Sequence, residues 1–249
     1  MKVLSVGNSF SRDAHRYVHE IARHNGENIE TYNLYLSDCA LDRHYRNMLS
    51  GDRAYIYDYN GIETALHTSL EEALSLTSYD VITLQQVSIL SNDYDTFEPY
   101  LSELIRYIKK YQPKAKIMLH KTWVYRSGCD LLSRVAGYTD NSEMYADINE
   151  AYARALEEHP QIYGIIPTSD AIWRAMQLGA DKIYRDDQHL SLGFGRYMAA
   201  LTWYRTFTKK PVLPDTFSSF DSSVNAIERD IANEASAYAV ANNRHNNNA

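Results

Sequence analysis

Near its start the chain runs Val3-Leu4-Ser5-Val6-Gly7-Asn8-Ser9-Phe10-Ser11. The short apolar run at residues 3–6 predicts a buried strand that ends at the glycine, and residues 13–24 have apolar side chains at helical spacing. The chain therefore opens with strand, turn and helix. A serine stands at the point where the strand gives way to the helix.

The same alternation continues along the chain. Further strands are expected at residues 29–36, 80–84, 116–120 and 163–166, and helices within 62–76 and at 97–111, 142–158, 190–207 and 222–240. Alternating strands and helices predict right-handed crossovers and a parallel sheet covered on both faces. We therefore expect a three-layer α/β/α sandwich with about five parallel strands. Its ligand crevice should lie at the carboxyl ends of the strands.

The domain organisation follows from length and local composition. A chain of 249 residues can close one large core, and no linker divides it, so we expect a single domain over residues 1–241. Residues 37–61 have the least regular pattern and are predicted to be an insertion over the site. The asparagine-rich end, residues 242–249, predicts a disordered tail.

Composition excludes several classes of function. The chain has 25 Lys+Arg against 32 Asp+Glu and a net charge of −7, which argues against nucleic acid as a partner because that binding requires clustered basic charge. Its two cysteines, Cys39 and Cys129, form neither a disulfide framework nor a metal-binding spacing. The glycine-rich phosphate-binding motifs are missing as well. We expect no cofactor and no resident metal.

The start of the chain bears on localisation. The apolar run there is much shorter than a signal-peptide core, and no later run approaches the length of a membrane span. The expectation is a cytoplasmic protein without a membrane partner, although a chain already trimmed of its leader would look the same.

Ser9 is the first candidate for chemistry. A serine between a strand and a helix presents its hydroxyl at the sheet edge, with its backbone N–H near the positive helix N-terminus, where a developing oxyanion is stabilised. Serine is also a common helix N-cap. Taken alone, the motif does not separate a nucleophile from a cap.

A second candidate segment, near the C-terminus, decides between a nucleophile and a helix cap at Ser9. The segment Arg185-Asp186-Asp187-Gln188-His189 precedes a long predicted helix. An Asp-x-x-His turn lets the carboxylate of Asp186 hold Nδ1 of His189 while Nε2 points outward, which is the base that a serine hydroxyl needs. Together with Ser9 in an α/β chain, the pair predicts a Ser-His-Asp triad and hence a serine hydrolase.

These two segments resemble the Gly-Asp-Ser-Leu-Ser and Asp-x-x-His blocks of SGNH/GDSL hydrolases. Residues 84–88, Leu-Gln-Gln-Val-Ser, and the run His-Leu-Ser from residue 189 with a following glycine resemble more closely a branch of that superfamily known mainly as a domain of unknown function. The resemblance implies a flavodoxin-like sandwich and a serine esterase. Its substrates would be esters, often acetyl groups on carbohydrates.

The chain departs from the family pattern in its oxyanion-hole blocks. Glutamines stand where the family has an asparagine, so the amide of Gln85 or Gln86 is expected to donate in its place. The turn after the second strand has no glycine, and the backbone N–H of Cys39 or Ala40 is expected to serve beside that of Ser9.

Candidate substrate-binding residues are Asn8, Tyr45 and Trp123, and for Trp123 core packing is an equal alternative. The 21 tyrosines either pack and anchor loops or form amphipathic walls for a sugar-like substrate. His15 and His19 have a zinc-like spacing but no third ligand, so a structural role is expected. The alternatives to a deacetylating esterase are a thioesterase or lipase and a non-catalytic carbohydrate-binding protein.

Overall fold

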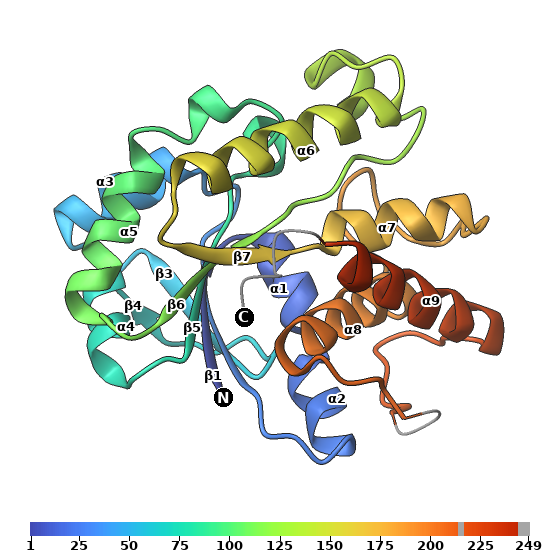
Figure 1. Ribbon diagram of the computed structural model, residues 1–249, viewed down its shortest axis with the longest axis horizontal. Coiled ribbons are helices and arrows are strands. Elements are labelled where there is room, and N and C mark those ends of the chain that lie inside the picture. Colours follow the sequence, from blue (N-terminus) through green and yellow to red (C-terminus); the bar gives the residue numbers. More distant parts are fainter. Residues whose placement is uncertain (214–216, 244–249) are drawn as a thin grey trace.

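The computed structural model describes residues 1–213 and 217–243 as one mixed sheet between two layers of helices (Figure 1). The sheet has seven strands in the order β4-β3-β2-β1-β5-β6-β7. The strands are β1 (Lys2–Gly7), β2 (Glu30–Tyr35), β3 (Tyr55–Tyr59), β4 (His67–Thr68), β5 (Val81–Leu84), β6 (Lys116–His120) and β7 (Ile162–Ile166). This is the expected α/β/α sandwich with two more strands than the sequence pattern predicts.

The five predicted strands are β1, β2, β5, β6 and β7, and all of them pair in parallel. Apart from β2, whose sequence includes polar residues, they are short apolar runs because they are largely buried on both faces, as all four residues of β5 are. The two additional strands are antiparallel and extend the sheet beyond β2. The chain order reverses at β1, which lies between β2 and β5, and this is where an open α/β sheet forms its crevice.

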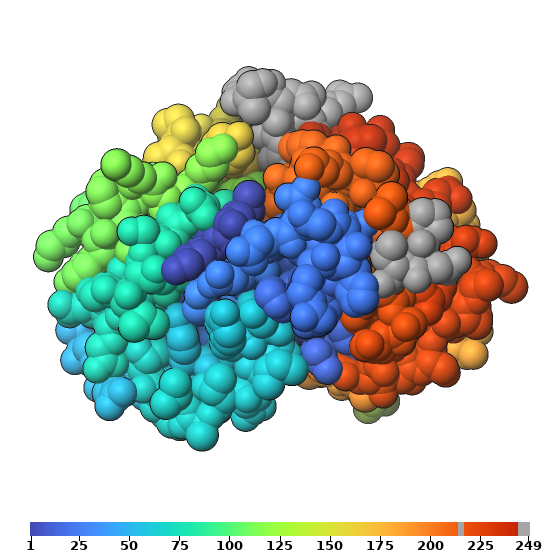
Figure 2. Space-filling view, turned by 90° about the horizontal axis from the view of Figure 1, so that it is seen from below, coloured from blue at the N-terminus to red at the C-terminus, as the bar shows by residue number. Residues whose placement is uncertain are grey.

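Two hydrophobic cores separate the sheet from its helix layers. One layer contains α3 (Leu41–Ser50), α4 (Leu70–Leu76), α5 (Tyr100–Tyr111) and α6 (Asn141–Glu158). The other contains α1 (Ser9–His15), α2 (Val18–His24), α7 (Thr168–Gln177), α8 (Phe194–Thr208) and α9 (Ala226–Asn242). In the space-filling view blue residues near the start of the chain lie against orange residues of its last third (Figure 2), and α1 and α2 both pack against α8, so the two ends of the chain share one core.

The segment at residues 37–61 corrects an expectation. It is not an irregular insertion, since it forms α3 and the strand β3, which pairs with β2 and with the edge strand β4. Leu41 and His44 of α3 are buried, and the two tyrosines that face the core from β3, Tyr55 and Tyr57, are 0% and 8% exposed. In β3 tyrosine alternates with both apolar and charged residues, which is not the alternation of apolar with polar residues that predicts a strand.

The ends of several elements also differ from the predicted ones. The first predicted helix is two helices, α1 and α2, and the sequence pattern missed α7, which follows β7 directly. At the other end Asn242 is the last residue of α9, and the Asn243 side chain donates a hydrogen bond to the Ile165 carbonyl. The rest of the predicted tail, residues 244–249, lies outside the described residues. None of the described helices is both long enough and apolar enough to cross a membrane.

Candidate active site

The turn between β1 and α1 places Ser9. The side chain of Asn8 caps α1 by accepting a hydrogen bond from the backbone N–H of Phe10 at 3.0 Å, so Ser9 becomes the first residue of the helix. The turn also needs a glycine before it, because a Cβ at Gly7 would lie 2.3 Å from the Ser11 hydroxyl oxygen. Ser9 is therefore half-buried at the carboxyl end of the central strand.

A closed loop, residues 183–191, carries the acid and the base, and we call it the His189 loop. Backbone hydrogen bonds join its two sides, from Ser191 N to Ile183 O at 2.7 Å and from Arg185 N to His189 O at 2.9 Å. Within the loop one carboxylate oxygen of Asp186 accepts hydrogen bonds from the backbone N–H groups of Gln188 and His189. These contacts fix the backbone on both sides of His189.

The structure brings the three predicted residues together in one line. His189 Nδ1 donates to the second carboxylate oxygen of Asp186 at 2.8 Å, which leaves Nε2 to accept from the Ser9 hydroxyl, also at 2.8 Å. This is the tautomer in which the imidazole can take a proton from the serine. The His189 side chain is 21% exposed and that of Asp186 is 49% exposed, so the carboxylate end is the more open to solvent, while Ser9 is half-buried.

The electrostatics keep Asp186 ionised. Its partial burial by itself would raise the pKa of the carboxyl, but the hydrogen bonds from the His189 and Gln188 backbone N–H groups outweigh that effect and hold the pKa below its usual value. A permanently charged carboxylate is the form that can stabilise an imidazolium at His189.

The turn after β2 lies next to Ser9. The backbone N–H of Leu36 donates to the Gly7 carbonyl at 3.3 Å, and the Asn8 side chain donates to the Cys39 carbonyl at 3.3 Å. Asp38 has φ of 49°, so the chain turns sharply before Cys39 and Ala40. This places the expected oxyanion donors, the backbone N–H groups of Ser9 and of Cys39 or Ala40, on adjacent turns.

The two glutamines after β5 are not available as oxyanion donors, which corrects the expectation for both. Gln86 is fully buried, its oxygen accepts from the backbone N–H groups of Leu41 and Val87, and its NH2 donates twice to Thr96. Gln85 is 2% exposed and donates to the Asn8 side chain while accepting from His120. Both therefore hold the turns that surround Ser9.

Two of the three predicted substrate-binding residues, Asn8 and Trp123, are also corrected, whereas Tyr45 is half-buried and its role stays a prediction. Asn8 is 2% exposed and Trp123 is fully buried, so neither contacts a ligand. The Trp123 ring stacks on Phe10 at 4.0 Å between ring centroids, and its indole N–H donates to the Gln188 carbonyl. Trp123 thus supports the His189 loop. Tyr45 lies on α3 with its ring against Tyr100 of α5, in the helix packing of that layer.

His15 and His19 make separate contacts with their surroundings. His15 is buried, and its Nε2 lies 2.8 Å from the Ser5 hydroxyl oxygen. His19 Nδ1 donates to the Ile29 carbonyl at 2.9 Å. Both contacts are structural, the role that the lack of a third ligand in the sequence predicted.

A second set of residues lies beside the triad and was not predicted from the sequence. Tyr125 donates to the Ser88 hydroxyl at 3.0 Å, and that hydroxyl donates to the side-chain oxygen of Gln188 at 3.2 Å. Arg126 pairs with Asp187 at 2.5 Å. The one available signal was the position of Ser88, just beyond the carboxyl end of a predicted parallel strand.

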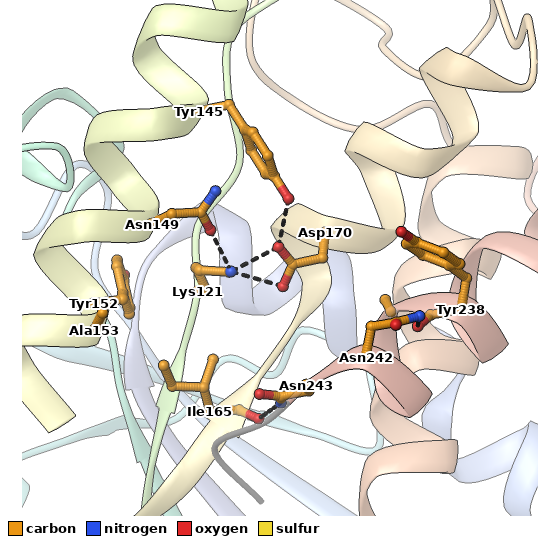
Figure 3. A pocket seen from close by; sticks show the side chains of 11 residues that line it. Lys121, Tyr145, Asn149, Tyr152, Ala153, Ile165, Asp170, Tyr238, Asn242 and Asn243 are labelled. Carbon is orange, nitrogen blue, oxygen red and sulfur yellow. Dashed lines mark hydrogen bonds and ion pairs between the residues drawn. The ribbon is translucent and has the colours of Figure 1, made fainter.

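A cavity of about 400 Å³ lies between α6, α7 and α9 (Figure 3). Lys121 is buried in its wall and donates to Asn149 at 2.6 Å and to Asp170, which also accepts from Tyr145. Because these groups satisfy one another and no triad residue lines the cavity, we assign it no part in the chemistry.

Comparison with known proteins assigns the family. The model of a family described as a domain of unknown function, DUF4886, matches residues 2–239. The chain belongs to the DUF4886 family. A crystal structure of a DUF4886 family protein from Bacteroides uniformis is 32% identical and superposes with a TM-score of 0.90, over 97% of this chain and 95% of that one.

More distant structures show the fold. A protein from Slackia heliotrinireducens described as a candidate SGNH hydrolase is 22% identical, with a TM-score of 0.59 over 83% of this chain and 98% of that one. A member of the lipolytic G-D-S-L family from Veillonella parvula is 17% identical, with a TM-score of 0.54 over 84% of this chain and 100% of that one. This DUF4886 chain therefore has the SGNH/GDSL hydrolase fold. No curated protein sequence is significantly similar to it.

Proposed function

We propose that this protein is a serine-dependent carboxylic ester hydrolase. The observation that carries the proposal is the unbroken line from the Ser9 hydroxyl through His189 to Asp186, with two distances of 2.8 Å. The SGNH/GDSL hydrolase fold supports it. A binding protein would have no need of a serine, an imidazole and a carboxylate in this order.

The reaction would proceed through an acyl-enzyme. Ser9 Oγ attacks the ester carbonyl carbon as its proton passes to His189 Nε2, and the tetrahedral oxyanion is held by backbone N–H groups of Ser9 and of Cys39 or Ala40. The C–O bond to the alcohol breaks, and His189 returns the proton to the leaving oxygen. Water then attacks the acyl group through the same base and frees Ser9. One such oxyanion donor contributes about 3 kcal/mol.

Other nucleophiles near the turn are poorly suited to compete. Burial raises the pKa of the Cys39 thiol to about 12, so the sulfur stays protonated at neutral pH and is a weak nucleophile. Ser11 is fully buried and donates to the Asn33 side chain at 2.7 Å. Ser9 is the hydroxyl that combines exposure with a base.

We propose a small acyl group on a polar alcohol, such as an acetylated carbohydrate, as the substrate. Ser9, Asp186 and His189 line none of five cavities with volumes of about 200–400 Å³ in the described part of the chain. A long acyl chain would require a deep apolar cavity beside the nucleophile. An open site favours a short acyl group.

A panel of esters tests the proposal. Acetylated mono- and oligosaccharides are compared with short-chain and long-chain acyl nitrophenyl esters, with Ser9→Ala as the control for serine dependence. We expect turnover of acetyl esters to exceed that of long-chain esters and to vanish in the variant. A preference for long acyl chains would contradict the substrate class, and an active Ser9→Ala protein would contradict the mechanism.

A further inference from the structure

Asp13 is a buried carboxylate that the triad does not include. It is 1% exposed, and such a charge needs compensation by partners that donate to it. Arg185 donates to both of its oxygens at 2.9 and 3.0 Å, and Arg196 Nε donates at 2.8 Å. The backbone N–H of Leu190 donates at 3.0 Å. Four hydrogen bonds therefore converge on one side chain.

The position of Asp13 connects two parts of the active site. It lies on α1 one turn after Ser9, at an i+4 spacing that puts both residues on the same face of the helix. Its partners Arg185 and Leu190 immediately flank the segment that carries Asp186 and His189. One carboxylate thus joins the helix of the nucleophile to both ends of the segment that carries the base.

We propose that Asp13 is a positioning residue that sets the distance between the Ser9 hydroxyl and His189 Nε2, an inference that rests on the proposed function. The His189 loop is closed on itself by backbone hydrogen bonds, so it moves as a unit and needs an external anchor to hold it against α1. The Trp123 indole N–H and the Arg126 backbone N–H hold the loop from the strand β6 side, by donating to the carbonyls of Gln188 and Asp187. Asp13 is the anchor from the α1 side.

The chain offers a matched control at Asp221. This carboxylate also pairs with Arg196, at 3.0 Å, and with Arg16 at 2.5 Å. It belongs to the same cluster of charges but makes none of the hydrogen bonds to the His189 loop that Asp13 makes. Asp221→Asn therefore removes the same charge from the same cluster and spares the anchor.

Steady-state kinetics on an acetyl ester separate the two variants. Asp13→Asn should lower kcat by about 100-fold with little change in KM, the loss typical of a catalytic group displaced by about 1 Å. Asp221→Asn should keep kcat within about threefold of wild type. Equal losses of kcat in the two variants would overturn the proposal.

A second comparison tests whether Asp13 acts through His189. In a His189→Ala background the residual rate should be the same with and without the Asp13→Asn substitution, because a positioning residue has no effect once its target is removed. A further loss of the residual rate on Asp13→Asn would show a general structural role instead.

Nuclear magnetic resonance gives a readout independent of turnover. The ¹⁵Nε2 resonance of His189 should move on Asp13→Asn to the position that it takes in Ser9→Ala. Both changes break the hydrogen bond between the Ser9 hydroxyl and the imidazole, one by displacement and the other by removal of the hydroxyl. A wild-type resonance position in folded Asp13→Asn would refute the anchor. If Asp13→Asn does not fold, Arg185→Met takes its place, since Asp13 then keeps Arg196 and the Leu190 N–H as partners.

These experiments distinguish the proposed esterase function from the proposed role of Asp13. A wild-type protein that cleaves no ester and binds no organophosphonate would refute the proposed function, and the resonance comparison would then decide the role of Asp13 alone. An active, Ser9-dependent enzyme in which Asp13→Asn behaves like Asp221→Asn would retain the proposed function and lose the anchor.

Discussion

At the scale of single residues, the triad was predictable and its surroundings were not. Asp186 and His189 are three residues apart, so one carboxylate reaches both the backbone N–H and Nδ1 of His189. That geometry is local and can be derived from sequence. The roles of Gln85 and Trp123 depend on which direction each side chain takes in the folded chain. Both point into the core, and residue type alone could not show this.

The two aspartates of the His189 loop should differ in their effect on rate. Asp186→Asn should lower kcat by several orders of magnitude, because an amide cannot hold His189 in the required tautomer. Asp187→Asn should be mild, since Asp187 is 39% exposed and pairs with the surface residue Arg126. Steady-state kinetics of the two purified variants would show this, and equal losses would contradict the assignment of Asp186.

The pH dependence of kcat/KM should show one titrating group on its acid side. Only neutral His189 can accept the serine proton, so activity falls as the imidazole becomes protonated. The pKa of Asp186 lies below its usual value, so its carboxylate stays charged until the pH falls below about 3.9. The acid limb should therefore have unit slope. A slope of two would mean that Asp186 titrates together with His189.

At the scale of elements, the central part of the fold follows from the sequence pattern and the edge does not. Apolar runs identify β1, β5, β6 and β7 because most of their residues are buried. The strand β3, which lies between β2 and the edge strand β4, has a tyrosine-rich sequence that includes the buried Asp58, so its pattern does not predict a strand. The helix α7 was missed because it begins immediately after β7, with no loop pattern between the two.

The junction between β1 and α1 gives a prediction at this scale. A Cβ at Gly7 would lie 2.3 Å from Ser11 Oγ and 2.9 Å from Ser11 Cβ, so Gly7→Ala must displace the first turn of α1 and Ser9 with it. We expect a loss of about 1–3 kcal/mol in the free energy of unfolding, together with a lower kcat. Chemical denaturation measures the free energy of unfolding, and steady-state kinetics measure kcat.

The control for this prediction is Ser11→Gly, which removes the two nearest of the three atoms that the new Cβ would meet and leaves Gln85 Oε1 at 3.2 Å. The effect of Gly7→Ala on unfolding should be smaller in the Ser11→Gly background than in the wild type. Additive effects of the two substitutions would show that the contact with Ser11 is not the source of the strain.

At the scale of the whole molecule, three buried histidines should govern stability in acid. Burial lowers the pKa values of His15, His44 and His120 to about 3, whereas an unfolded chain protonates histidine near pH ~6.5. Below that pH the unfolded state binds protons that the folded state does not, so stability falls as the pH decreases. Three groups together give a slope of about 4 kcal/mol per pH unit.

Urea denaturation at a series of pH values would measure this slope. His120→Gln should reduce the proton uptake on unfolding by about one, even where it lowers stability at neutral pH. A free energy of unfolding that does not change between neutral pH and the acid transition would contradict the neutral state of these histidines in the folded protein.

The assignment of Ser9 as the nucleophile of this SGNH-type fold is tested most directly by covalent labelling. The wild-type protein is treated with a fluorophosphonate and the modified peptide is identified by mass spectrometry, with Ser9→Ala, Ser11→Ala and His189→Ala in parallel. We expect one adduct per chain at Ser9, unchanged in Ser11→Ala, slowed in His189→Ala and lost in Ser9→Ala. An adduct on any other residue, or undiminished labelling of Ser9→Ala, would contradict the account.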